Sequence, residues 1–145
     1  MELTTNQKGD LTELYVLTAF MERGIMVSTP YGQNSRYDFI IDVNNNLYRV
    51  QVKASKIDDD HSKFTFYTAS SHITGRGHHK KTYSSKEVDL FATYCEGRVY
   101  IIPILECEGK KQKTLRFVPP KNNQKEGIYY AKDYELDLWL DSIKE

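Results

Sequence analysis

Four polar residues within the first 53 positions have the types and spacing suited to metal-assisted hydrolysis: Glu13, Asp38, Gln51 and Lys53. A carboxylate such as Asp38 can anchor a hard divalent cation, and a second carboxylate could come from Glu13. The Gln51 side chain and the Val52 backbone carbonyl would add neutral oxygen ligands. A lysine beside the cation, here Lys53, can orient or deprotonate an attacking water and stabilise the charge that develops during phosphodiester hydrolysis.

A β-hairpin is expected to bring Asp38 close to Lys53. Residues 37–43 and 47–54 have the composition of two strands, and the three asparagines between them can adopt the positive φ of a hairpin turn. A two-residue turn would place Asp38 opposite Gln51, and a four-residue turn would place it opposite Lys53. Either even-length turn gathers the three side chains on one face, whereas an odd length would scatter them.

Glu13 lies on a helix predicted for residues 7–23, which Gly24 would end. Its neighbours at helical spacing are largely apolar: Gly9, Val16, Leu17 and Phe20. A half-buried carboxylate needs a partner, and a metal ion would be one. By spacing alone, Glu13 could also be an ordinary boundary glutamate, and Asp38 with Lys53 a surface ion pair worth about 0–1 kcal/mol.

The rest of the chain adds strands, a loop and a final helix. Strands are predicted at 25–29, 63–69, 88–95, 99–105 and 115–118, a long polar loop at 70–85, and a helix at 133–143. This order predicts an α+β or mixed α/β fold, and with no repeat or linker we expect a single domain over residues 1–145.

The composition favours a cytoplasmic protein without membrane association. No apolar run approaches the ~20 residues of a membrane helix, and the N-terminus lacks a signal-peptide pattern. Cys95 and Cys107 are too few for a disulfide framework.

The charges are balanced but segregated. The chain has 20 Lys+Arg and 20 Asp+Glu, although nucleic-acid binding domains are usually basic. Residues 61–86 contain five Lys/Arg and all four histidines, residues 109–125 contain six Lys/Arg, and neither segment contains an acid. Both segments are either solvated surface or contacts to double-stranded DNA, with Arg76, His78, His79, Lys80, Lys81, Tyr83, Lys110, Lys111, Lys113 and Arg116 as candidates.

The order of these residues resembles that of the PD-(D/E)XK, or restriction-endonuclease-like, nuclease superfamily. The similar elements are Lys8-Gly9-Asp10-x-x-Glu13, Gly24, Ser35, Tyr37-Asp38, Gln51-Val52-Lys53 and the strands that begin at Val88 and Val99. The chain is similar to group I intron-associated homing endonucleases and, more loosely, to archaeal Holliday-junction resolvases. It departs from the family pattern at Tyr37, which replaces a proline, and at Gln51, which replaces an acidic residue and removes one charge from the site.

The resemblance implies a restriction-endonuclease-like mixed β-sheet flanked by helices. It also implies that Asp38 binds metal, that Glu13 is the helix carboxylate and that Lys53 acts on the water. The expected activity is that of a Mg²⁺-dependent endodeoxyribonuclease, with Mn²⁺ as an alternative metal, and the expected role is site-specific homing. Since cutting both strands needs two active sites, we expect a homodimer or homotetramer on a near-palindromic target.

Two alternatives remain open. One is a Holliday-junction resolvase or DNA-repair nuclease on the same fold. The other is a catalytically degenerate DNA-binding module, for which Gln51 is the best argument.

Overall fold

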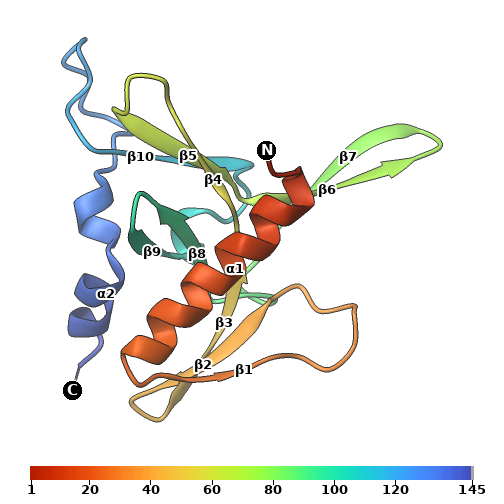
Figure 1. The fold of residues 1–145 in the computed structure, drawn as a ribbon. Coiled ribbons are helices and arrows are strands. Elements are labelled where there is room, and N and C mark those ends of the chain that lie inside the picture. Colours follow the sequence, from red (N-terminus) through yellow and green to blue (C-terminus); the bar gives the residue numbers. More distant parts are fainter. Residues whose placement is uncertain (145) are drawn as a thin grey trace.

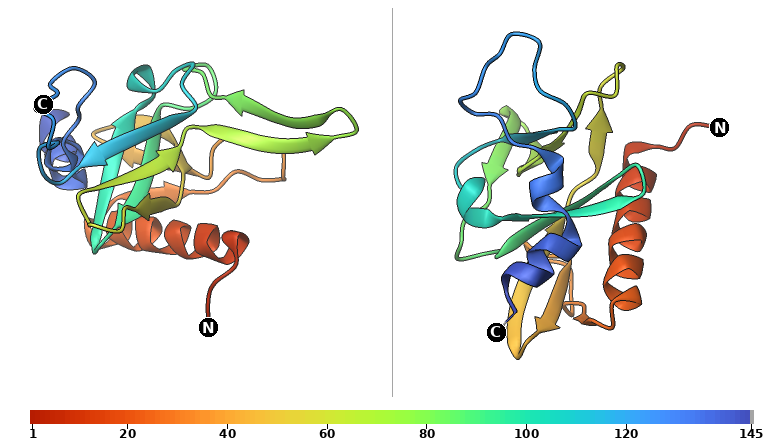
Figure 2. Two further views of the ribbon diagram at one scale, coloured as in Figure 1. Left: turned by 90° about the horizontal axis from the view of Figure 1, so that it is seen from above. Right: turned by 90° about the vertical axis from the view of Figure 1, so that its left-hand side faces the viewer.

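A central five-stranded sheet carries both helices on one face and a smaller sheet on the other (Figures 1 and 2). The computed structural model describes residues 1–144, and of residues 72 and 73 it describes the backbone only. The central sheet has the order β1 (Met26–Ser28), β2 (Phe39–Val43), β3 (Asn46–Val52), β8 (Leu90–Cys95) and β9 (Arg98–Pro103). The smaller sheet has the order β10 (Gln112–Arg116), β5 (Lys63–Tyr67) and β4 (Ser55–Ile57).

Helix α1 (Thr5–Glu22) confirms the predicted first helix and begins two residues earlier. Thr4 caps its start, because Thr4 Oγ1 accepts from the Gln7 amide at 3.1 Å while Gln7 Oε1 accepts from the Thr4 amide at 2.9 Å. Gly24, at a φ of 71°, ends the helix as predicted. The face with Val16, Ala19 and Phe20 is buried against the sheet.

The β2–β3 hairpin has the shorter of the two predicted turns. Asn44 and Asn45 adopt φ values of 52° and 66°, and Val43 pairs with Asn46. Phe39 pairs with Val50, so continuing this register places Asp38 opposite Gln51. The turn thereby fixes which residues meet at the far end of the hairpin.

Strands β8 and β9 contribute residues to both hydrophobic cores. They form a hairpin around Glu96–Gly97, as predicted, and β8 runs parallel to β3. Ala92 and Ile101 face the core beneath α1, whereas Phe91 and Ile102 face the core beneath the smaller sheet. This alternation follows the two-residue period of a strand buried on both faces.

The prediction of a long loop at residues 70–85 is wrong. Most of it forms a hairpin of β6 (Ala69–Thr74) and β7 (Gly77–Thr82), which projects from the body of the protein (Figure 2). The described residues of β7 are exposed or half-buried, so neither face needs apolar side chains and the sequence carries no alternating pattern.

The C-terminal helix is shorter than the predicted 133–143. Residues Ala131–Tyr134 form a 3₁₀ turn, η2, and α2 (Leu136–Ser142) begins after it, with Leu136 buried. A second 3₁₀ turn, η1 (Ile104–Glu106), follows β9. Within residues 1–144, neither helix is long and apolar enough to span a bilayer.

Candidate active site

The fold brings Asp38, Gln51 and Val52 into direct contact where β2 begins and β3 ends. Gln51 Nε2 donates to Asp38 Oδ2 at 2.9 Å, and the Val52 amide donates to the same oxygen at 2.8 Å. The Asp38 amide donates to the Val50 carbonyl at 2.8 Å, which continues the hairpin ladder to Asp38. The carboxylate is therefore held in place by the strand opposite it.

Glu13 reaches the same carboxylate from α1. Burial raises the pKa of Glu13 from 4.5 to about 7, and a hydrogen bond with Asp38 and the charges of Asp38 and Asp10 act in the same direction. Glu13 thus favours its protonated form where it lies against the Asp38 carboxylate. A divalent cation could replace that proton and relieve the repulsion.

Lys53 lies beside this pair and is half-buried. Its Nζ is 3.5 Å from the Ala69 carbonyl and 5.2 Å from the ring centroid of Tyr83. Burial lowers the pKa of Lys53, nearby Asp38 partly offsets this, and Arg36 adds to the lowering. A lysine whose pKa is lowered next to a carboxylate site is suited to handling a proton.

Arg36 is a neighbour of the site that sequence reasoning missed. Its Nη1 donates to Ser70 Oγ at 2.9 Å, its Nη2 donates to the Thr82 carbonyl at 2.9 Å, and its Nε is 3.2 Å from Glu87 Oε2. The guanidinium also lies 3.8 Å from the ring centroid of Tyr83. Arg36 therefore holds both strands of the β6–β7 hairpin at their base. The sequence signal that could have indicated this role is its position two residues before Asp38.

The donor set fits a hard cation that keeps several waters. Glu13 and Asp38 offer carboxylates, and Gln51 and Val52 offer neutral oxygens of the kind that Mg²⁺ accepts. Across the part of the chain that the structure describes, no group of three or more His, Cys, Asp or Glu side chains is placed to hold a metal. A cation at this site would therefore depend on the two neutral oxygens and on water.

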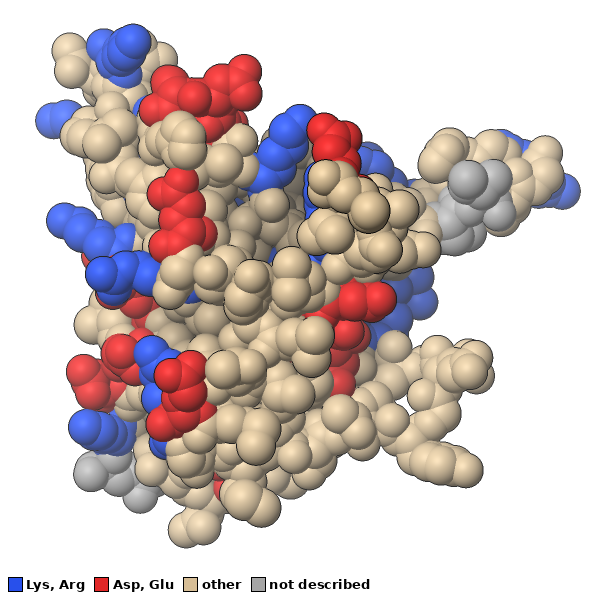
Figure 3. Space-filling model, in the orientation of Figure 1, with Lys and Arg blue, Asp and Glu red and all other residues tan. Residues whose placement is uncertain are grey.

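The two basic segments meet at the base of the projecting hairpin. Thr68 donates its amide to the Lys111 carbonyl at 2.9 Å and its hydroxyl to the Lys110 carbonyl at 2.5 Å. Seven of the predicted DNA contacts have exposed side chains on this hairpin or beside its base: Arg76, His78, His79, Lys80, Lys81, Lys110 and Lys111. Figure 3 shows Lys and Arg side chains on the projecting hairpin and beside its base.

Two other predicted DNA contacts, Tyr83 and Lys113, are buried, and a third, Arg116, is half-buried. Tyr83 is buried against Phe91, with its ring centroid 5.4 Å away. Lys113 is 4% exposed. Arg116 is half-buried and donates its Nε to the Val118 carbonyl at 2.9 Å. The residue types of Tyr83 and Lys113 suggested DNA contacts, but these two side chains are used inside the fold. Arg116 stays a predicted contact.

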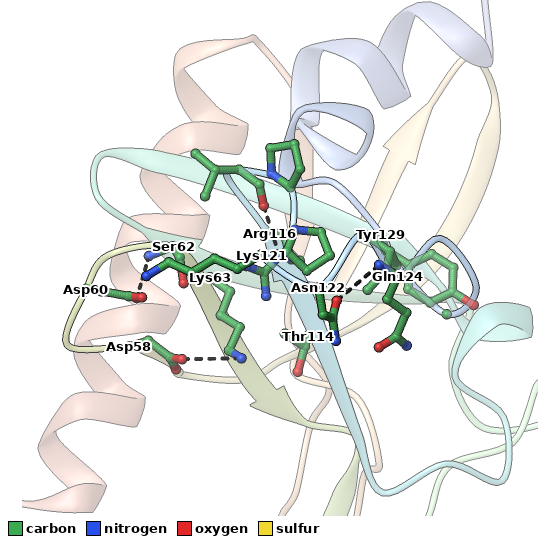
Figure 4. Close-up of a pocket in the computed structure, with 15 residues that line it drawn as sticks. Asp58, Asp60, Ser62, Lys63, Thr114, Arg116, Lys121, Asn122, Gln124 and Tyr129 are labelled. Atoms are coloured by element: carbon green, nitrogen blue, oxygen red, sulfur yellow. Dashed lines mark hydrogen bonds and ion pairs between the residues drawn. The ribbon is translucent and has the colours of Figure 1, made fainter.

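Arg116 lines a cavity of about 520 Å³ between β5, β10 and the segment that follows β10 (Figure 4). Two acidic groups of the lining have partners there: Asp58 Oδ2 lies 3.6 Å from Lys63 Nζ, and Asp60 accepts from the Ser62 amide at 3.0 Å. None of the four predicted catalytic residues lines this cavity. It is separate from the candidate active site.

A mixed sheet with an aspartate before one strand, a lysine after its hairpin partner and a helix carboxylate beside them defines a nuclease core of the restriction-endonuclease type. The sequence profile of the PD-(D/E)XK endonuclease family matches residues 3–137, and the chain belongs to this family. The resemblance inferred from the motifs is thereby confirmed, and the chain is an endonuclease by family.

A comparison with solved structures supports the same fold. The bacterial homing endonuclease I-Ssp6803I is similar with a TM-score of 0.75 and 20% sequence identity, and the match covers 98% of each chain. At this identity the likeness concerns the fold, and it confirms the expected restriction-endonuclease-like architecture. A comparison with curated proteins gives no significant match.

Proposed function

We propose that the chain is a divalent-metal-dependent, site-specific DNA endonuclease of the homing type that acts as a homodimer or homotetramer. The observation that carries this proposal is the convergence of Glu13, Asp38 and Gln51, with Lys53 beside them. The structural likeness to a homing endonuclease over nearly the whole chain supports the homing role.

Each residue has a distinct task in the proposed reaction. Asp38, Glu13, Gln51 and the Val52 carbonyl would hold Mg²⁺ or Mn²⁺, which stabilises developing negative charge and makes bound water more acidic. Asp38 is oriented by its two hydrogen bonds, and Glu13 would have to be in its ionised form to hold the cation. Lys53 Nζ orients the attacking water and holds or moves its proton.

The projecting hairpin would contact the DNA. A two-stranded ribbon fits the major groove, and the exposed cations of β7 together with Lys110 and Lys111 would pair with phosphates. Binding should weaken with salt, because log K falls by about 0.9 per log unit of salt for each phosphate neutralised. A nearly flat salt response would contradict this surface.

Selection from a random DNA library, with sequencing of the cut ends, tests the function directly. With Mg²⁺ we expect cleavage at one near-palindromic target, and Asp38→Asn should bind that target without cutting it. Asp42→Asn is the matched control, because Asp42 is an exposed aspartate on β2 and should leave cleavage intact. Undiminished cleavage by Asp38→Asn, or no cutting with either metal, would contradict the proposal.

Gln51 favours one competing function, a DNA-binding module without catalysis, since it removes a charge from the metal site. Calorimetry separates the two: a degenerate module binds DNA but neither Mg²⁺ nor Mn²⁺. Four-way junctions serve as a further control in the cleavage assay, because cutting restricted to junctions would indicate a resolvase rather than a homing enzyme.

A further inference from the structure

A cavity of about 540 Å³ opens directly beside Lys53. It lies between the first turns of α1, the residues that follow β3 and the base of the β6–β7 hairpin, and its lining includes Gly9, Lys53, Tyr67, Ser71, His78 and Lys80. Lys53 is the one predicted catalytic residue in this lining. A ligand in the cavity would therefore adjoin the reaction centre.

The lining of this cavity suits an anion with a flat apolar part. None of its described lining residues is acidic, whereas Lys53 and Lys80 carry positive charge. Tyr67 is 57% exposed, and Lys80 Nζ lies 4.8 Å from its ring centroid. An exposed aromatic face beside an ammonium group matches a nucleotide, whose base or sugar can stack while its phosphate pairs with the cation.

Gly9 adds an independent argument. A glycine inside a helix is less stable than alanine by about 0.5–1 kcal/mol, so its presence in α1 needs a reason. Packing within the chain gives none, because a Cβ built at Gly9 would meet no atom within 4 Å. The space beside Gly9 belongs to the cavity, and a larger side chain there would enter it.

We propose that this cavity is the subsite for a nucleotide that flanks the scissile phosphate in the cleaved strand. Lys80, assisted by His78, binds the flanking phosphate, and Tyr67 supports the sugar or base. The assignment rests on the proposed endonuclease function, because it names a contact of the same substrate at the same site.

The test combines altered DNA with altered protein. Each phosphate next to the cut is replaced in turn by an uncharged methylphosphonate, and single-turnover cleavage is measured for the wild type, Lys80→Ala and Lys81→Ala. At one position the replacement should slow the wild type about tenfold, as expected for a lost ion pair to phosphate, and should not slow Lys80→Ala further. Lys81→Ala, which alters a residue outside the cavity lining, should keep the full tenfold sensitivity whatever its own rate.

A cavity-filling series gives a second readout. Gly9→Ala should fold more stably but cut more slowly than the wild type, and Gly9→Phe should fold and lose at least tenfold in cleavage. Leu14→Phe is the control, since Leu14 is an exposed residue of the same helix that does not line the cavity. Two outcomes would overturn the subsite: additive effects of Lys80→Ala and the methylphosphonate, or normal cleavage by Gly9→Phe. Cleavage by the wild type would still support the proposed endonuclease function in either case. If the wild type cuts no DNA, the proposed function and the subsite both fail.

Discussion

Two lysines of this chain, Lys53 and Lys113, are withdrawn from solvent beside a tyrosine and a carboxylate, yet their surroundings differ. Lys113 Nζ lies 3.5 Å from Glu106 Oε1 and 3.3 Å from the ring centroid of Tyr129. Tyr134 donates its hydroxyl to the same Glu106 oxygen. Lys113 thus has a dedicated counterion and two tyrosines around it, and it joins β10 to the C-terminal segment.

Lys53 has no such closed environment. Among the residues that the structure describes, no carboxylate lies within ion-pair distance of its Nζ, and the nearby Asp38 is engaged by Gln51 and Val52. Lys53 also borders an open cavity, which Lys113 does not. Burial of a lysine is therefore not what indicates function here. An ammonium group without an ion pair that borders a cavity is the better sign.

The largest expected effect comes from removing the first of these lysines. Lys53→Met keeps most of the aliphatic stem but loses the ammonium, so single-turnover cleavage should fall by about 10²–10⁴-fold, the range for a group that transfers or orients a proton. The thermal midpoint and DNA affinity should change little, because Lys53 has no ion pair to lose. A loss of less than tenfold would place the proton chemistry elsewhere.

The second lysine should show the opposite behaviour. Lys113→Ala removes the ion pair and the aliphatic packing, so the free energy of unfolding should fall by about 2–3 kcal/mol, less than for a fully buried pair because Glu106 stays partly hydrated. Denaturant titration measures this loss, and cleavage per folded molecule should be unchanged. Lys113→Met, which keeps the packing, should lose less. Impaired cleavage by folded Lys113→Ala would break the contrast between the two lysines.

The site was predictable from the sequence where periodicity and turn chemistry determine geometry. The Asn44–Asn45 turn fixed the register that sets Asp38 opposite Gln51. The end of the helix that presents Glu13 followed from its glycine stop, Gly24. Backbone rules of this kind act locally, so the sequence contains them in full.

The parts that could not be predicted depend on tertiary packing. Among the apolar residues of α1, Leu11, Leu14 and Tyr15 are at least partly exposed, while Val16 and Phe20 are buried. Likewise, nothing local distinguishes the buried Lys113 from the exposed Lys111, since both lie in one basic run. Only the partners Glu106, Tyr129 and Tyr134 separate them. Composition identifies a basic segment but does not tell which of its side chains face solvent.

Arg36, the arginine near Lys53, offers a further test of the difference between the two lysines. Arg36→Lys keeps the charge but loses the planar fork that holds Ser70 and Thr82, so the hairpin base that contacts Lys53 should shift. We expect cleavage at saturating DNA to fall about tenfold, as for a small misplacement of a catalytic group, with little change in DNA affinity.

Arg49→Lys is the matched control for this experiment. Arg49 makes a similar fork, to Asp89 at 3.1 Å and to the Ser85 carbonyl at 2.9 Å, but has no contact with the hairpin base in the described structure. Both variants should lose comparable stability, and Arg36→Lys should additionally lose turnover. Equal turnover in the two would show that Lys53 is positioned without Arg36.

The smallest predicted effect concerns Glu13, the helix carboxylate of the candidate site, and the pH dependence of metal binding. Glu13 has a pKa raised to about 7, so in the metal-free protein its contribution to stability is fully present below pH 4.5 and is lost as the pH rises toward 7. A divalent cation needs the ionised form, and its affinity should therefore be about tenfold lower at pH 6 than at pH 8.

Calorimetric titration with Mg²⁺ at the two pH values measures this difference in affinity. Glu13→Gln should remove the difference. Glu22→Gln, which alters an exposed residue at the end of the same helix, should not. Persistence of the tenfold difference in Glu13→Gln would mean that another group takes up the proton. Glu13 would then resemble Glu106 more closely than the geometry implies. It would be a fixed partner of its neighbours and not a group whose proton a metal ion can replace.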